Sequence, residues 1–258
     1  MKLYQLALQT LIHQKTWVVA AFLLLVAPWV LPHFTPIEYN RGLLEPARAQ
    51  AAWGISWFLA LTWGMFHIAQ LGDHFRKSGL APYFKVQGVN ALQQLGQCSL
   101  AILTLLAPLA VCSCIICIIG ACPKNPIEAQ HWIFLNLQSV LLFLLILTPV
   151  LLYVYALSSR FGSTAGFSFG LGLMVYGMWG VGLLESMLSV RPSPLMETLW
   201  TLSPHYHLGD MTPRFVFKMG AVAAGDYMQL LGYFTILLAL TCGATFLTYR
   251  SQPNVVKA

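Results

Sequence analysis

Long apolar runs, separated by short polar segments, repeat along the whole chain. A transmembrane helix needs about 20 mainly apolar residues. Six runs meet that requirement, at residues 16–34, 51–71, 98–121, 132–157, 164–190 and 227–249. The pattern predicts an all-α polytopic membrane protein in which six transmembrane helices form one domain covering residues 1–258.

Two segments outside these runs are also expected to be helical. Residues 2–15 gather apolar side chains near one face of a helix, namely Leu3, Leu6, Ala7 and Leu11. An N-terminal helix of this kind suits the membrane interface ahead of the first span, although a plain extension of that span is an equally good interpretation. Residues 191–226 form the longest segment between spans and contain apolar clusters, which predict short re-entrant or interfacial helices between spans 5 and 6.

The composition places the chain in a lipid bilayer. Hydrophobic residues make up 58% of the chain and charged residues 9%, whereas soluble domains carry about 25% charged residues. The net charge is +6, and with six spans the side of the two termini collects more lysine and arginine than the other side. Since cytoplasmic loops are enriched in these residues, we expect an inner-membrane protein with both termini in the cytoplasm. No basic stripe with interleaved aromatic residues is present, so no nucleic-acid partner is expected.

The segment 71–97 is the only long polar and basic stretch between two strongly apolar runs. Arg76, Lys77 and Lys85 are opposed there by a single acid, Asp73. Residues that interrupt helices recur within it: Gly72, Gly79, Pro82, Gly88 and Gly96. We therefore predict a short cytoplasmic helix–turn–helix in place of one straight helix. An ordinary positively charged cytoplasmic loop is the competing interpretation.

Three polar residues lie in or beside the apolar runs. Arg160 belongs to the tight turn LSSRFGST between spans 4 and 5, a second place where a cytoplasmic partner could touch. His67, near the inner end of span 2, could line a substrate path, but an interfacial residue is the usual role at a span end. Glu185 in span 5 is a second candidate for the path. Because Arg191 follows it by six positions, Glu185 could instead sit among outer headgroups or pair with that arginine.

Span 3 ends in a group of cysteines with the spacing C-x-C-x2-C-x4-C: Cys112, Cys114, Cys117 and Cys122. Cysteine packs as a small hydrophobe in apolar helices, which is the simplest interpretation. An outer disulfide through Cys122 and a metal site are alternatives. A third alternative is a membrane thiol–disulfide or quinone-linked enzyme, since Cys114 and Cys117 form a C-x-x-C pair.

The remaining motifs indicate no catalytic site. His205, His207 and Asp210 form an H-x-H…D cluster, which either holds a metal or caps a re-entrant helix as a polar turn; no fourth ligand is evident. The chain has no G-x-x-x-x-G-K-[ST] loop, so it cannot bind ATP in the P-loop manner. We expect no enzyme activity and no cofactor. A non-catalytic assembly subunit of a larger membrane complex stays open as an alternative.

Three stretches carry a family likeness that extends over nearly the full chain: TWVVAAFLLLVAP at 16–28, LSPHYHLGDMT at 202–212 and GDYMQLLGYFTILLALTCGATFLTYRSQ at 225–252. Together with the N-terminal helix, the basic loop and the tight turn, they resemble the membrane subunit of type-2 ABC transporters, notably the branch described as multicopper-enzyme-maturation permeases. The resemblance implies an exporter permease that dimerises with itself or a related chain. It also implies that a separate P-loop ATPase subunit drives transport.

The resemblance assigns roles to particular residues. The loop 72–96 would hold the first coupling helix, and the turn 158–164 would hold the second. The implied ATPase-coupling residues are Asp73, His74, Arg76, Lys77, Lys85 and Arg160. Gly88 and Gly96 are not followed by the lysine of the commoner family pattern, so the register of the first coupling helix departs from it. Movement of the loop would tilt spans 2 and 3 and change access at the dimer interface.

Overall fold

The computed structural model describes residues 2–13, 15–34 and 44–250, and all regular elements in these ranges are helices. The first half of the chain contains α1 (Lys2–His13), α2 (Thr16–Val30), η1 (Leu31–Phe34), α3 (Leu44–Leu59), η4 (Ala60–Gly64), α4 (Met65–Lys77), α5 (Leu80–Val86) and α6 (Ala91–Gly120). The second half contains α7 (Pro126–Phe161), α8 (Ser163–Val175), η5 (Tyr176–Gly180), α9 (Val181–Val190), α10 (Pro194–Leu202), η6 (Tyr206–Gly209), α11 (Thr212–Val216) and α12 (Ala224–Arg250). Here η1 and η6 are 3-10 helices, whereas η4 and η5 are π-helices.

Within the described ranges, five helical segments are long and apolar enough to cross a bilayer: Thr16–Phe34, Ala91–Gly120, Pro126–Phe161, Ser163–Val190 and Ala224–Arg250. They coincide with five of the predicted spans, and an all-α membrane protein is confirmed at this level. The other predicted span, 51–71, falls inside the continuous helical run of α3, η4 and α4, which is not among the five. Three tryptophans, Ser56 and His67 make this run less apolar than the others.

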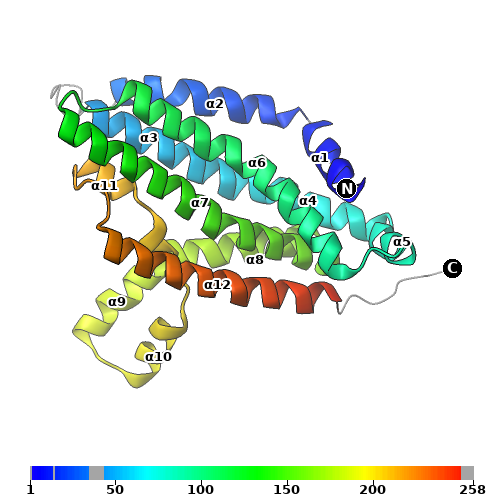
Figure 1. The fold of residues 1–258 in the computed structure, drawn as a ribbon. Helices are drawn as coiled ribbons and strands as arrows, with labels where there is room; N and C mark the ends of the chain where they lie inside the picture. The colour runs from blue at the N-terminus through cyan, green and yellow to red at the C-terminus, as the bar shows by residue number, and fades with distance from the viewer. Residues whose placement is uncertain (1, 14, 35–43, 251–258) are drawn as a thin grey trace.

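The helices lie side by side in an elongated bundle with two different ends (Figure 1). α1, α5 and the C-terminal part of α12 lie at one end, which we call the hairpin end because it contains the helix–turn–helix of residues 72–96, the hairpin. α9, α10 and α11 lie at the other end, which we call the opposite end.

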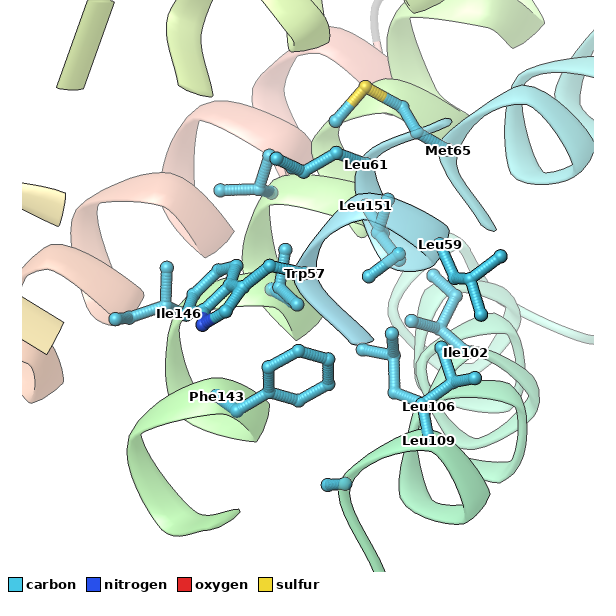
Figure 2. Packing of buried hydrophobic residues seen from close by; sticks show 14 of the residues in the cluster. Trp57, Leu59, Leu61, Met65, Ile102, Leu106, Leu109, Phe143, Ile146 and Leu151 are labelled. Atoms are coloured by element: carbon cyan, nitrogen blue, oxygen red, sulfur yellow. The ribbon is translucent and has the colours of Figure 1, made fainter. Parts of the chain in front are cut away.

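The helix α7, 36 residues long, forms the centre of the bundle. It packs against α4, α6, α8 and α12. Within its apolar 18-residue stretch 67% of the residues are buried, a larger share than in the other four candidate spans. Figure 2 shows Phe143 of α7 beside Trp57, with Leu151 of α7 and Ile102 of α6 in the same apolar cluster. The Trp57 and Phe143 rings meet edge to face at 5.0 Å. Because lipid tails are as apolar as these side chains, close packing is what holds such helices together.

Glycines permit the closest of these helix contacts. At Gly72 of α4, an added Cβ would lie 2.6 Å from the carbonyl oxygen of Tyr155 and 2.9 Å from Ser158 Cβ, both on α7. On α8, an added Cβ would collide with Ser158 of α7 at Gly166 and with Val154 of α7 at Gly170. The G-x-x-x-G pair of span 5 therefore packs against α7 within the same chain.

The N-terminal helix α1 lies against the hairpin end of α6 and has the predicted two-sided character. Leu3 and Ala7 are buried, whereas Gln9 is exposed. The side-chain oxygen of Gln97 on α6 accepts hydrogen bonds from the backbone N–H groups of Leu3 at 3.1 Å and Tyr4 at 3.3 Å. These are donors that the start of a helix leaves without intrahelical partners, so Gln97 fixes where α1 begins.

Arg48 of α3 closes the opposite end of α6. Its guanidinium carbon lies 4.4 Å from the centroid of the Trp29 ring, and its Nη1 donates a hydrogen bond to the carbonyl oxygen of Gly120, the last residue of α6. A cation at a helix C-terminus compensates the helix dipole. Arg48 thus ties α2, α3 and α6 together at this end.

The short helices expected between spans 5 and 6 are present as α10, η6 and α11. Part of this segment belongs to the core and not to the membrane interface. Phe215 of α11 is fully buried and stacks on Trp53 at 6.4 Å. Gly209 of η6 approaches α7 so closely that an added Cβ would collide with Ile146. Phe215 lies in the core and not at the membrane interface because aromatic side chains of α3 and α7 pack around it.

Replacing Gly72 with alanine should destabilise the protein by about 1–3 kcal/mol, because the new methyl group overpacks the contact with α7. The thermal midpoint of the purified chain in detergent measures the effect. Gly243→Ala on α12 is the matched control, since an added Cβ there meets nothing within 4 Å, and it should be neutral or stabilising by up to about 1 kcal/mol. Equal midpoints for the two variants would contradict the close contact.

Candidate functional site

The hairpin is a helix–turn–helix, as the sequence predicts. α4 continues to Lys77, and Gly79 follows in the left-handed conformation with φ 65°. α5 is seven residues long, and Gly88, at φ 82°, starts the turn that leads into α6. Asn90 begins α6 with a capping box, because its side chain accepts from the Gln93 backbone N–H at 2.8 Å while the Gln93 side chain accepts from the Asn90 N–H at 3.1 Å.

Only some of the expected helix breakers interrupt the chain. Gly79 and Gly88 lie in turns at positive φ, whereas Gly72, Pro82 and Gly96 lie inside helices. Pro82 is in the first turn of α5, where a missing N–H costs nothing. Gly72 allows the close contact between α4 and α7. Glycine at positive φ, and not glycine as such, therefore sets the shape of the hairpin.

A cluster of charged side chains lies at the end of α4. Asp73 Oδ1 accepts hydrogen bonds from Arg76 Nη2 at 2.7 Å and Nε at 3.1 Å, and Lys77 Nζ lies 2.7 Å from Asp73 Oδ2. Burial acts to raise the pKa of the Asp73 carboxyl, but the hydrogen bonds and charges of Lys77 and Arg76 outweigh it and hold that pKa below its usual value. The Asp73 side chain is 11% exposed, against 43% for Arg76 and 69% for Lys77. The cluster therefore presents positive charge to its surroundings.

The turn between α7 and α8 meets this cluster directly. It consists of the single residue Gly162, at φ 101°. A Cβ on Gly162 would lie 3.5 Å from Arg76 Nη2 and 3.7 Å from Asp73 Oδ1. Arg160 is exposed in the last turn of α7, with its guanidinium over the Phe161 ring at 5.1 Å. The two segments that the sequence marks as separate contact points thus form one continuous surface.

The helix α5 adds exposed apolar side chains to this surface. Val86 is 88% exposed and Tyr83 is 55% exposed, whereas Phe84 between them is buried. Lys85 is also exposed. His74 on α4 is exposed and has Phe75 as its ring neighbour at 6.3 Å. A short helix that buries one aromatic ring and displays Tyr83 and Val86 has the form of a docking element.

The two candidate path residues are not brought together. His67 is buried, and its Nε2 lies 2.8 Å from the Thr16 hydroxyl at the start of α2. Trp63 donates to the same hydroxyl at 3.0 Å, so His67 and Trp63 hold the start of α2 against the α3–α4 run. Glu185 is exposed on α9, at the opposite end of the bundle.

The cysteines give no support to redox chemistry. All six are free, and Cys114 and Cys117 are buried in α6 at 8% and 0% exposure. Burial, together with the nearby Glu45 carboxylate, raises the pKa of the Cys122 thiol, which disfavours the reactive thiolate. Cys122 is free in the structure, so it forms no disulfide there. Cys114 and Cys117 pack as small hydrophobic side chains in the core.

The H-x-H…D cluster also has structural roles. His205 is buried, its ring lies 3.0 Å from the Trp200 carbonyl oxygen, and its backbone N–H donates to the Tyr233 hydroxyl at 2.9 Å. Asp210 accepts a hydrogen bond from the Thr212 backbone N–H at 3.0 Å. Across residues 2–13, 15–34 and 44–250, no group of three or more His, Cys, Asp and Glu side chains could hold a metal ion.

Residues 166–170, GFSFG, match the G-x-S-x-G spacing of a hydrolase nucleophile elbow. That motif needs a sharp strand-to-helix turn to present its serine. Here the five residues lie inside α8, with both glycines packed against α7 and Ser168 exposed on the far side. The match reflects helix packing and not catalysis.

One buried polar contact at the hairpin end has no signal in the sequence. The Tyr249 hydroxyl of α12 donates to Gln94 Oε1 of α6 at 2.6 Å, across 155 positions of the chain. Neither residue type is unusual in its local context. Only the folded bundle reveals that the last turn of α12 is bonded to the base of the hairpin.

The chain matches no protein-family model, no curated protein and no solved structure. The resemblance to type-2 permeases therefore stays a prediction from the residues and layout of this chain.

Asp73→Asn should lower the stability of the purified protein at pH 7 by about 1 kcal/mol, the scale of exposed ion pairs. Because the native pKa of Asp73 lies below the ordinary 3.8, its contribution is complete above that pH and is lost as the pH falls through the lowered value. The difference in thermal midpoint between wild type and variant should therefore shrink below about pH 4. Asp226→Asn, at an exposed acid of α12, is the control. A difference that is the same at pH 7 and pH 3 would argue against the ion pairs.

Proposed function

We propose that the chain is the membrane-spanning permease subunit of a transporter that a separate P-loop ATPase drives. The ATPase subunit docks on the hairpin end, and two permease subunits, identical or related, form the path through the membrane. Export is the direction that the resemblance to type-2 ABC permeases favours. The proposal assigns no substrate, because the two candidate path residues lie on different helices, His67 on α4 and Glu185 on α9.

The proposal includes a sixth crossing, made by the helical run from α3 to α4. This run lies inside the bundle, where Trp53, Ser56 and His67 meet protein and not lipid, so it can cross with fewer apolar residues than an exposed span. Trp53 donates to the Asn136 side chain at 3.1 Å, and Ser56 donates to the Leu109 carbonyl oxygen at 3.1 Å. With six crossings, both termini and the hairpin share the cytoplasmic side of an inner membrane.

One observation carries the proposal: the hairpin and the α7–α8 turn form a single surface. Gly72 is packed on α7, and the position of a Gly162 Cβ is 3.5 Å from Arg76 Nη2. A force applied to this surface therefore reaches α4, α7 and α8 at once. The chain has no P-loop of its own, so in this proposal the free energy of ATP hydrolysis reaches it through a partner that touches this surface.

The chemistry of the surface fits a protein partner better than lipid or water alone. Positive side chains favour the cytoplasmic side, and Lys77, Lys85 and Arg160 are all exposed. Val86 and Tyr83 are apolar or aromatic groups displayed on the same short helix. Exposed apolar side chains rimmed by polar ones are typical of protein interaction sites. We predict that the ATPase has a groove that accepts α5.

Val86→Ser should weaken the docking of the ATPase while leaving the permease folded, because the side chain is 88% exposed. An interface anchor typically contributes about 1–2 kcal/mol, so ATP hydrolysis recovered with the affinity-purified chain from native membranes should fall about 5- to 30-fold. The control is Val190→Ser, a valine 79% exposed at the opposite end, which should change nothing. Absence of ATP hydrolysis from the wild-type preparation would overturn the transporter proposal in favour of an assembly subunit.

The orientation of the hairpin can be measured separately. A Val86→Cys variant in intact cells should resist a membrane-impermeant maleimide and react only after the inner membrane is permeabilised. A Ser193→Cys variant, in the segment between α9 and α10, should react in intact spheroplasts. The wild-type chain, with its own six cysteines, supplies the background. Labelling of Val86→Cys from outside would place the hairpin where no ATPase can reach it.

A further inference from the structure

The base of the hairpin is bonded to the last turn of α12. Gln94 is buried at the start of α6, and its Nε2 donates to the Val89 carbonyl oxygen at 2.9 Å, in the turn that follows α5. Its Oε1 accepts from the Tyr249 hydroxyl at 2.6 Å. One amide side chain thus joins the hairpin turn to α12, and both of its polar groups are used in doing so.

The ring of Tyr249 extends this connection to α4. It stacks on Tyr155 of α7 at 6.0 Å with 26° between the planes, and Tyr155 meets the Phe75 ring edge to face at 6.0 Å. Phe75 is fully buried and lies between Asp73 and Arg76 in sequence. Tyr249 therefore contacts, directly or through one ring, both helices that flank α5.

Nearer its start, α12 is also bonded to the segment between α9 and α12, residues 191–223, which we call the outer segment. The Tyr233 hydroxyl accepts the backbone N–H of His205 at 2.9 Å. The neighbouring Phe234 is buried, and its ring would lie 3.2 Å from a Cβ on Gly209 of η6. The same helix thus ends in a polar contact with the hairpin and carries, about four turns earlier, a polar contact with η6.

Between these two contacts α12 packs along α7 and, to a smaller extent, α6. Most of its remaining surface is open, since only 11% of its apolar 18-residue stretch is buried, the lowest share among the five candidate spans. A continuous helix of this kind is stiff along its axis, and it can shift or rotate as one body against α7. These are the properties needed to carry a displacement from one end of the bundle to the other.

We propose that α12 transmits the position of the hairpin to the outer segment, with Tyr249 and Tyr233 as the two positioning residues. The role of an ATPase in moving the hairpin rests on the proposed function. The mechanical link between the hairpin and the outer segment does not depend on that function. When the hairpin shifts, Gln94 carries Tyr249 with it, and α12 moves Tyr233 against His205. The state of the outer segment is thereby set from the hairpin end without a polar path through the bundle.

The test is hydrogen exchange on the full chain in lipid nanodiscs, comparing wild type with Tyr249→Phe. The variant keeps the ring and loses only the hydroxyl. Exchange of peptides covering 87–94 should quicken by about 3- to 10-fold, the scale of one buried hydrogen bond. Peptides covering 203–211 should also quicken, although they lie at the other end of the bundle. Peptides from α2 should be unchanged.

Two matched variants complete the design. Tyr83→Phe removes a hydroxyl that accepts from Gln87 on the exposed face of α5 at 2.9 Å, and it should leave 203–211 untouched. Tyr233→Phe should quicken the hydrogen exchange of peptides covering 87–94, because coupling between two sites is reciprocal. Unchanged exchange at 203–211 in Tyr249→Phe, or faster exchange in every peptide including α2, overturns the proposal. No ATPase is present in the experiment, so its outcome is independent of whether the transporter assignment holds.

Discussion

The lack of a Cβ on Gly72 determines how closely α4 approaches α7 at the hairpin end. With hydrogen in place of Cβ, Gly72 lets the backbone of α4 rest on the Tyr155 carbonyl and the Ser158 side chain of α7. That approach brings Asp73 and its two cations to the turn at Gly162, and it buries Phe75 against Tyr155. An added methyl group at this position would overpack the contact with α7 and so weaken the link between the basic hairpin and the α7–α8 turn.

Polar and aromatic contacts occur at both ends of the bundle. At the hairpin end, ion pairs and hydrogen bonds around Asp73 and Gln94 lie beside the rings of Tyr155 and Tyr249. At the opposite end, Phe215 stacks on Trp53, and Arg48 combines a cation–π contact with a hydrogen bond to Gly120. The middle is filled by apolar side chains from α3, α6 and α7. In lipid, where burial of apolar groups gives little driving force, such polar and aromatic contacts at the two ends fix the register of the helices.

Much of the fold was predictable because apolar runs of span length leave few alternatives to helix. The start of the first span at Thr16 agrees with the structure, and the predicted turn at 158–164 contains the break at Gly162, although α7 continues four residues beyond the predicted span end, to Phe161. The hairpin charges were visible as a cluster, but their meeting with Gly162 was not, since it depends on the packing of Gly72. The role of Gly72 itself was misjudged, because local propensity treats every glycine as a break. Contacts such as Gln94 with Tyr249 join residues whose types say nothing about their partners.

The length of α7 has a consequence for how the protein sits in its membrane. At 1.5 Å per residue, its 36 residues span about 54 Å, whereas the hydrocarbon core measures about 30 Å. The helix is too long to fit upright within that layer, even with some tilt. About 24 Å of helix is therefore left over, and α7 has to extend past the hydrocarbon layer at one or both of its ends. Ser158 to Arg160 lie in its last turn, so the joined surface of hairpin and turn stands at one of these two ends.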